Sequence, residues 1–156
     1  PLPMQQLGHG GPPGQDGLDD LVTRIGNRIG LENVLRFLPA DSHIPERAFL
    51  IAPAAYSAPE NGPWAAPRPR PLRLFPPEPI AGTGARPPKH FRWRRMAFAA
   101  ARATGPERIA PEWWLEDDNW RSGVRDYWQV ETLQGRRLWL YYTPQNPGWF
   151  VQGEFA

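Results

Sequence analysis

The residues best suited to a chemical role are arginines interleaved with aromatic residues at positions 89–95. This segment reads Lys-His-Phe-Arg-Trp-Arg-Arg. Arginine and lysine bind phosphate groups, and phenylalanine and tryptophan offer flat faces on which unpaired bases stack. The candidate nucleic-acid-binding residues are therefore Lys89, Arg92, Trp93, Arg94 and Arg95. The alternative is a structural strand whose aromatic side chains pack inward while its arginines face water.

The charge distribution along the chain points the same way. The formal net charge is only +2, but residues 61–110 carry ten basic and two acidic residues. Residues 1–60 and 111–156 each carry seven acidic residues and four arginines. A basic middle between acidic flanks indicates contact with nucleic acid or an acidic protein. The alternative explanation is that arginine simply keeps the surface soluble, because this chain has only one lysine.

Catalytic and metal-binding chemistry find little support. The chain has no cysteine, which excludes disulfides, thiolate zinc sites and a cysteine nucleophile. Its three histidines lack metal-ligand spacing, and adjacent Ser42 and His43 have no oxyanion-hole motif nearby. The run Glu116-Asp117-Asp118 could bind a cation but is more typical of a solvated loop. We therefore expect no catalytic residue, no metal site and no cofactor.

The first part of the chain predicts a helix followed by short strands. Apolar residues at the spacing of one helix face are Leu18, Leu21, Val22, Ile25 and Ile29, and Gly30 can end the helix. Residues 33–37 and 48–51 are strand candidates. Residues 52–70 are rich in proline, including the run PRPRP, and predict an extended linker. We expect domain boundaries at 1–51, 52–70 and 71–156.

The last part of the chain predicts mainly antiparallel β-structure. A strand at 71–75 should end at Pro76-Pro77, and residues 90–93 and 96–101 flank a possible turn at Arg94-Arg95. Residues 97–101 fit a helix equally well. Three aromatic-rich segments, 127–132, 136–143 and 149–155, are separated by turn sequences and predict a three-strand meander. The predicted class is α+β, with one amphipathic helix and short strands before this β module.

Tryptophan is concentrated in the last third of the chain. Trp128, Trp139 and Trp149 fall on the three predicted strands, which favours a place in the core. Trp113 and Trp114 instead fall in the irregular segment 105–124, where a long loop with a helical turn is expected. An exposed aromatic pair in a loop can anchor a partner protein. Trp113 and Trp114 are therefore the candidate partner-binding residues.

Several phrases of the sequence resemble the C-terminal part of ImuB-type proteins, which are catalytically degenerate relatives of Y-family translesion DNA polymerases. They are LDDLVTRIGNRIG, ENVLRFLPADSHIPERAF, RPLRLFPPEPI and FRWR, and above all GPERIAPEWW, RDYW and the terminal GWFVQGEFA. The resemblance implies that residues 1–51 are the end of a little-finger-like region. The remainder would be a C-terminal extension, and the whole chain a fragment of a longer protein.

The resemblance also implies a function and partners. The chain would be a non-enzymatic adaptor in damage-induced translesion synthesis. It would recruit an error-prone replicative-type DNA polymerase and a RecA-like accessory protein. Gln6-Leu7 could begin a sliding-clamp-binding peptide, although Gly8-His9-Gly10 lacks the apolar pair such a peptide needs. The alternative function is a single-stranded nucleic-acid-binding module that uses residues 89–95. Independently of the resemblance, no signal peptide is visible, so the cytoplasm is the expected location. No apolar run is long enough to span a membrane.

Overall fold

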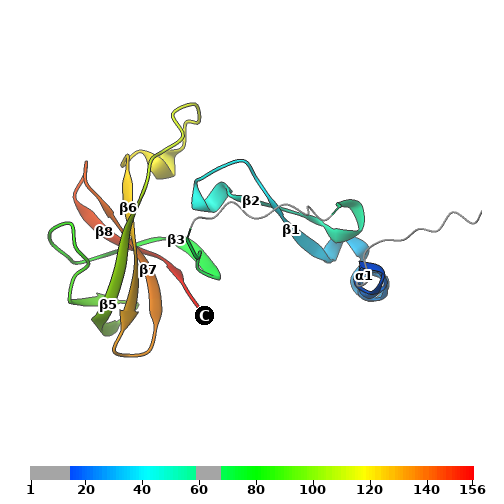
Figure 1. Cartoon of the computed structure of the whole chain (residues 1–156), viewed down its shortest axis with the longest axis horizontal. Coiled ribbons are helices and arrows are strands. Elements are labelled where there is room, and N and C mark those ends of the chain that lie inside the picture. The colour runs from blue at the N-terminus through cyan, green and yellow to red at the C-terminus, as the bar shows by residue number, and fades with distance from the viewer. Residues whose placement is uncertain (1–14, 59–67) are drawn as a thin grey trace, which may run out of the picture. The chain divides into compact units, whose positions relative to one another are not determined.

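The computed structural model describes residues 15–58 and 68–156, which form two compact units (Figure 1). The first unit contains residues 15–40 and 49–58, and the second contains residues 41–48 and 68–156. The predicted α+β class is confirmed, because one helix and short strands precede a six-stranded antiparallel sheet. Residues 41–48 belong to the second unit, while the residues before them (up to 40) and after them (from 49) belong to the first.

The first unit begins with the predicted helix, α1 (Gln15–Ile29). The helix ends at Gly30, whose φ of 95° disfavours any side chain. Within the helix, Gly26 allows a close approach, since a Cβ there would lie 2.3 Å from Leu31 Cδ2. The 3-10 turn η1 (Leu31–Asn33) can therefore fold back against the helix.

Two short strands complete the first unit. β1 (Leu35–Pro39) pairs antiparallel with β2 (Phe49–Pro53), each displaced by about two residues from its predicted position, and η3 (Ala54–Tyr56) follows. Much of this unit's apolar surface remains open to solvent. Phe37 is 61% exposed and Leu50 is 60% exposed. The α1 residues Leu18, Leu21, Ile25 and Ile29 are also exposed.

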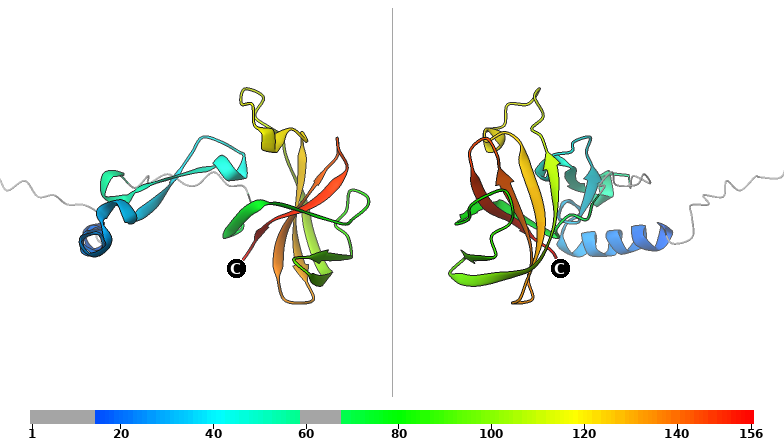
Figure 2. Two further views of the ribbon diagram at one scale, coloured as in Figure 1. Left: turned by 180° about the vertical axis from the view of Figure 1, so that it is seen from behind. Right: turned by 60° about the vertical axis from the view of Figure 1, so that its left-hand side comes forward.

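The second unit is a six-stranded antiparallel sheet in the order β3-β8-β7-β6-β5-β4. Its strands are β3 (Arg73–Ile80), β4 (His90–Trp93), β5 (Met96–Ile109), β6 (Arg125–Thr132), β7 (Arg137–Thr143) and β8 (Gly148–Glu154). The last three pair in sequence order, β6 with β7 and β7 with β8. The sheet curls strongly (Figure 2). Its edge strands β3 and β4 are joined by side chains, since Trp93 Nε1 donates a 2.7 Å hydrogen bond to Glu78.

The curled sheet has an apolar cluster on each face. All six strands contribute to the inner core, whose buried residues are Phe91, Trp93, Phe98, Val130, Leu138, Leu140, Trp149 and Val151. The outer core contains Ile44, Ile109, Trp120, Tyr127, Trp139 and Tyr141. β7 shows the predicted alternation, because Leu138 and Leu140 face inward while Trp139 and Tyr141 face outward. The outer core needs covering, and Ile44 and Trp120 come from outside the sheet to supply it.

Two strands differ from the sequence-based prediction. β3 does not end at Pro76-Pro77 but continues to Ile80, with a register shift between Leu74 and Glu78. An edge strand tolerates prolines at an irregular point because no partner on its open side needs their missing N–H. β5 is a strand rather than a helix and continues to Ile109, so it includes the first part of the predicted 105–124 loop.

Candidate interaction site

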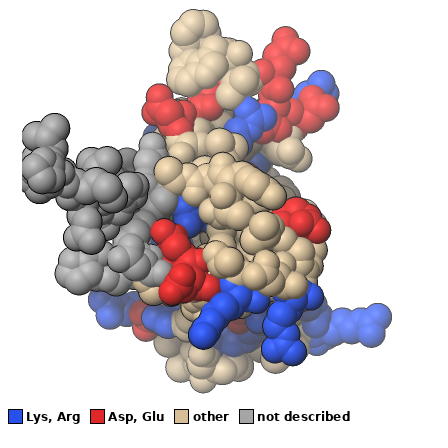
Figure 3. All heavy atoms as spheres, turned by 90° about the vertical axis from the view of Figure 1, so that its right-hand side faces the viewer, with Lys and Arg blue, Asp and Glu red and all other residues tan. Residues whose placement is uncertain are grey.

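The loop between β5 and β6 in the second unit carries three consecutive exposed apolar residues. Trp113 is 88% exposed, Trp114 is 60% exposed and the neighbouring Leu115 is 42% exposed. The two indole rings meet edge to face, with centroids 5.6 Å apart. We refer to residues 110–121 as the tryptophan loop. This loop projects at the top of the second unit in Figure 1. Figure 3 is turned about the vertical axis, so the same region is again at the top, where uncharged side chains lie beside carboxylates.

The tryptophan loop is anchored on its N-terminal side by a buried carboxylate. Glu112 is 3% exposed and accepts a 2.7 Å hydrogen bond from Ser42 Oγ. His43 Nδ1 lies 3.5 Å from the same carboxylate, and His43 Nε2 lies 2.9 Å from the Ala110 carbonyl oxygen. Both ends of the imidazole thus contact the loop. The residue just before Trp113 is therefore held firmly while Trp113 itself is exposed.

The C-terminal side of the tryptophan loop is held as well. Asp117 accepts a hydrogen bond from the Asn119 N–H at the start of η4 (Asp118–Trp120) and forms a 2.9 Å ion pair with Arg47. Trp120 is buried in the outer core. With both sides held, the exposed pair Trp113-Trp114 is presented from a fixed base, which lowers the entropy lost on binding a partner.

A buried arginine fixes the covering segment 41–48, which contains η2 (Pro45–Arg47). Arg125 is 1% exposed, and its guanidinium carbon lies 3.9 Å from the centre of the Trp120 ring and 4.5 Å from that of Tyr141. It donates a 3.3 Å hydrogen bond to Glu46 and also bonds the Asn119 carbonyl oxygen. The Tyr127 hydroxyl donates to Gln152, which in turn donates to Glu46. This network joins segment 41–48, η4 and the sheet.

Sequence reasoning missed this network. Arg125 and Glu46 are 79 positions apart, and Glu112 and Ser42 are 70 apart. No periodicity or motif connects residues at such separations. The only local signal is an arginine two residues before the predicted strand 127–132, and an arginine that faces solvent gives the same signal.

The predicted nucleic-acid-binding segment lies on the β4–β5 hairpin. Lys89, Arg92, Arg94 and Arg95 are exposed, but Trp93 is only 3% exposed. One neighbour of its ring is Phe75, which stacks on it at 5.5 Å, and another is the guanidinium of Arg94 at 4.6 Å. Trp93 therefore belongs to the inner core and offers no open face to a base. Gln6 and Leu7 lie outside the described residues.

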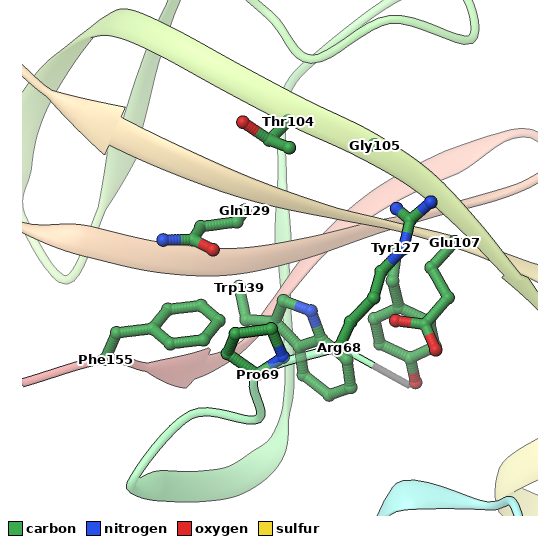
Figure 4. A pocket seen from close by; sticks show the side chains of 9 residues that line it. All are labelled: Arg68, Pro69, Thr104, Gly105, Glu107, Tyr127, Gln129, Trp139 and Phe155. Carbon is green, nitrogen blue, oxygen red and sulfur yellow. The ribbon is translucent and has the colours of Figure 1, made fainter. Parts of the chain in front are cut away.

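A shallow groove of about 340 Å³ lies on the outer face of the sheet. Figure 4 shows Thr104 and Gln129 on one side and Trp139, Pro69 and Phe155 on the other. Glu107, another lining residue, accepts two hydrogen bonds from Arg70, at 2.6 and 2.8 Å. Burial raises the pKa of Tyr127, so this phenol stays protonated and does not act as a base. Across residues 15–58 and 68–156, no cluster of His, Cys, Asp and Glu side chains could hold a metal ion.

Comparison with known proteins gives one clear relationship. Two curated proteins from strains of Caulobacter vibrioides, both described as protein ImuB, are 38% identical to this chain over 153 residues. The match includes 89% of this chain. The chain is homologous to ImuB. The predicted resemblance to ImuB-type proteins is therefore confirmed, and the chain spans about a third (33%) of the length of these relatives.

Other comparisons add nothing to this relationship. No protein-family model matches the chain, and no solved structure matches it. Among the helices that the structure describes, none has the length and apolar character needed to cross a membrane.

Proposed function

We propose that this chain is a non-catalytic adaptor segment that acts in damage-induced translesion synthesis in the cytoplasm. Its partners are an error-prone replicative-type DNA polymerase and a RecA-like accessory protein. The observation that supports this proposal most strongly is the exposed pair Trp113-Trp114 on a loop held at both sides. Homology to ImuB supplies the biological setting.

Exposed tryptophans in a held loop have the character of an interface hot spot. A buried indole contributes 150–250 Å² of contact area, and truncation of a hot-spot residue costs about 2 kcal/mol or more. That corresponds to about a 30-fold loss of affinity. Glu116 and Asp118 flank the tryptophans and are exposed. The contact that fits them is an apolar pocket with lysine or arginine at its rim.

A binding measurement with each partner tests this proposal. The 156-residue chain would be titrated with the polymerase and, separately, with the RecA-like protein by isothermal calorimetry. We expect binding to at least one, and a loss of about 30-fold or more in the variant carrying Trp113→Ala and Trp114→Ala. Leu133→Ala is the matched control, because Leu133 is 73% exposed in the β6–β7 turn.

One result would count against the adaptor proposal, and another would count against the tryptophan loop as its contact. If the longer protein binds these partners but this chain does not, recruitment does not occur through this segment. If the chain binds and the double tryptophan variant binds equally well, recruitment stands but the tryptophan loop is not the contact. A sliding clamp contact at Gln6 and Leu7 is a separate proposal, tested by Gln6→Ala with Leu7→Ala in a clamp titration.

A further inference from the structure

Seven arginines gather at one end of the curled sheet. They lie at the start of β3, on the β4–β5 hairpin and its continuation, and beside the β6–β7 turn. We call this surface the basic end, and its members are Arg73, Arg92, Arg94, Arg95, Arg102, Arg136 and Arg137. Three carboxylates lie among them, Glu78, Glu131 and Glu154, which leaves a formal charge of +4. The tryptophan loop, at the opposite ends of β5 and β6, carries four carboxylates and one arginine.

Two of these arginines are already used within the fold. Arg94 donates to Glu78 at 3.0 Å, and Arg136 donates two 2.6 Å hydrogen bonds to Glu154. Both guanidinium carbons also lie within 5.1 Å of the Trp93 ring. Arg94 and Arg136 therefore cover the inner core at this end of the sheet, and each binds one carboxylate, Glu78 or Glu154. Glu78 and Glu154 are then not available to the remaining arginines.

The other five arginines point to solvent. All five are exposed and, within the described part of the chain, form no ion pair; they are Arg73, Arg92, Arg95, Arg102 and Arg137. Arg102 and Arg137 flank Glu131 on neighbouring strands and share its face of the sheet. Arg92 lies on the solvent side of β4, because Phe91 and Trp93 on either side of it are buried.

The hairpin turn itself favours a functional role for its arginines. Trp93 pairs with Met96, so Arg94 and Arg95 alone form the turn, and their φ angles are 47° and 67°. Asn-Gly or Gly is the favoured choice at such positions, because side chains are strained there. Strain of this kind is common at functional sites. Arg95 combines that strain with an exposed side chain.

The spread of the arginines decides what kind of anion they fit. From Met96, which follows Arg95, to Arg102 the chain advances six residues along β5, which is about 20 Å at about 3.3 Å per residue. The guanidinium groups do not converge on one point, so a single phosphate ion would meet only one or two of them. A nucleic acid duplex carries about twelve phosphates along 20 Å of its axis. Arginine also matches phosphate oxygens with paired hydrogen bonds.

We propose that the basic end binds the phosphate backbone of nucleic acid without stacking on its bases. Phe91, Trp93 and Phe98 are each less than 5% exposed, so none of the hairpin's phenylalanine or tryptophan rings is open to a base. Binding through phosphates alone carries no base preference and accepts single and double strands. This differs from a single-strand module that depends on stacking. It also does not depend on the adaptor function, since the tryptophan loop lies at the other end of the sheet.

Fluorescence anisotropy with labelled oligonucleotides tests this proposal. The 156-residue chain would be titrated against a mixed-sequence single strand and its duplex between about 50 and 200 mM salt. We expect both to bind, with log affinity falling linearly in log salt and a duplex slope of about −4 for four or five phosphate contacts. Tryptophan emission should not change on binding. Strong quenching would show that bases stack and would overturn the proposal.

Two triple variants with equal charge change locate the site. The first carries Arg92→Gln, Arg95→Gln and Arg137→Gln, and we expect a salt slope shallower by about 3 and an affinity at least about 10-fold lower. The control changes three exposed arginines elsewhere, Arg24→Gln, Arg28→Gln and Arg121→Gln. It should bind within about threefold of the parent. Equal losses in both triples would show that only net charge matters, and the site would be rejected.

A single substitution separates loss of binding from loss of folding. Arg95→Gly removes one phosphate contact and relieves the turn, so it should bind more weakly yet melt at a higher temperature. Binding that is unchanged in Arg95→Gly would remove Arg95 from the site.

Other polyanions complete the test. Polyglutamate of matched charge and vesicles rich in phosphatidylserine would be measured beside the oligonucleotides. If either binds as tightly as the duplex, or if no oligonucleotide binds at about 50 mM salt, the nucleic-acid proposal fails.

Discussion

The β4–β5 turn provides the sharpest test of how this fold is stabilised. Arg95 has a φ of 67°, and a residue with a side chain in this region costs about 1–2 kcal/mol. Glycine removes that cost but adds about 0.5–1 kcal/mol of conformational entropy to the unfolded chain. Arg95 is exposed and has no ion pair among the described residues, so little else is lost. Arg95→Gly should therefore raise the free energy of unfolding by about 0.5–1 kcal/mol.

Thermal unfolding followed by circular dichroism would measure this change. For a unit of this size, we expect the melting temperature to rise by about 3–6 °C. Arg92→Gly is the matched control, since Arg92 is also exposed but lies within β4, where glycine should lower stability by about 0.5–1 kcal/mol. If Arg95→Gly melts at a lower temperature than the parent, the turn is not strained and this reasoning is refuted.

Three further predictions concern buried and paired groups. Arg125→Met should lower the free energy of unfolding by about 3 kcal/mol in urea titrations, because it removes the cation that pairs with Glu46 and the donor to the Asn119 carbonyl oxygen. Arg121→Met should change the free energy of unfolding little, because its ion pair with Asp118 is exposed. Hydrogen bonds from Arg136 lower the pKa of Glu154, so the ionised carboxylate stabilises the fold. This contribution to the free energy of unfolding is present above the ordinary carboxyl pKa of 4.5 and is lost as pH falls through the lowered pKa. Glu154→Gln should make the free energy of unfolding fall less steeply with decreasing pH. Burial raises the pKa of Tyr141 to about 12, so part of the tyrosine ultraviolet titration should appear above pH 10, and the stability that depends on the protonated Tyr141 phenol should be lost as pH rises above about 10.

The sequence predicted those features that depend on local pattern. The alternation in β7 placed Trp139 and Leu138 on opposite faces, because side chains alternate along any strand. The predicted hairpin turn at Arg94-Arg95 is also confirmed. Phe91 and Trp93 before it and Met96 and Phe98 after it each alternate with other residues, and the alternation is interrupted at the two arginines. The end of β3 was predicted wrongly, because whether proline is tolerated depends on whether the strand lies at a sheet edge, which the local sequence does not reveal.

Features that depend on distant contacts could not be predicted. Trp93 looked like a stacking face within a basic segment, and only the curling of the sheet places Glu78 against its indole nitrogen. Arg73 and Arg137 joined the basic end although they lie far from residues 89–95 in sequence. Trp113 and Trp114 were placed as exposed because their surroundings lack periodicity, and their exposure follows that expectation. Their role in binding a partner stays a prediction.

The placement of residues 41–48 limits how this protein can be divided or exchanged. Ile44 and Glu46 complete the outer core from a position in sequence between β1 and β2. A chain cut within the proline-rich stretch would therefore lose part of the second unit, even though the sequence marks that stretch as a natural boundary. A fusion or domain swap would retain an intact β unit only by beginning at or before residue 41, so it would always carry β2 with it. The smallest transferable unit is thus larger than the sheet, because it must include segment 41–48 and the strand β2 that follows it.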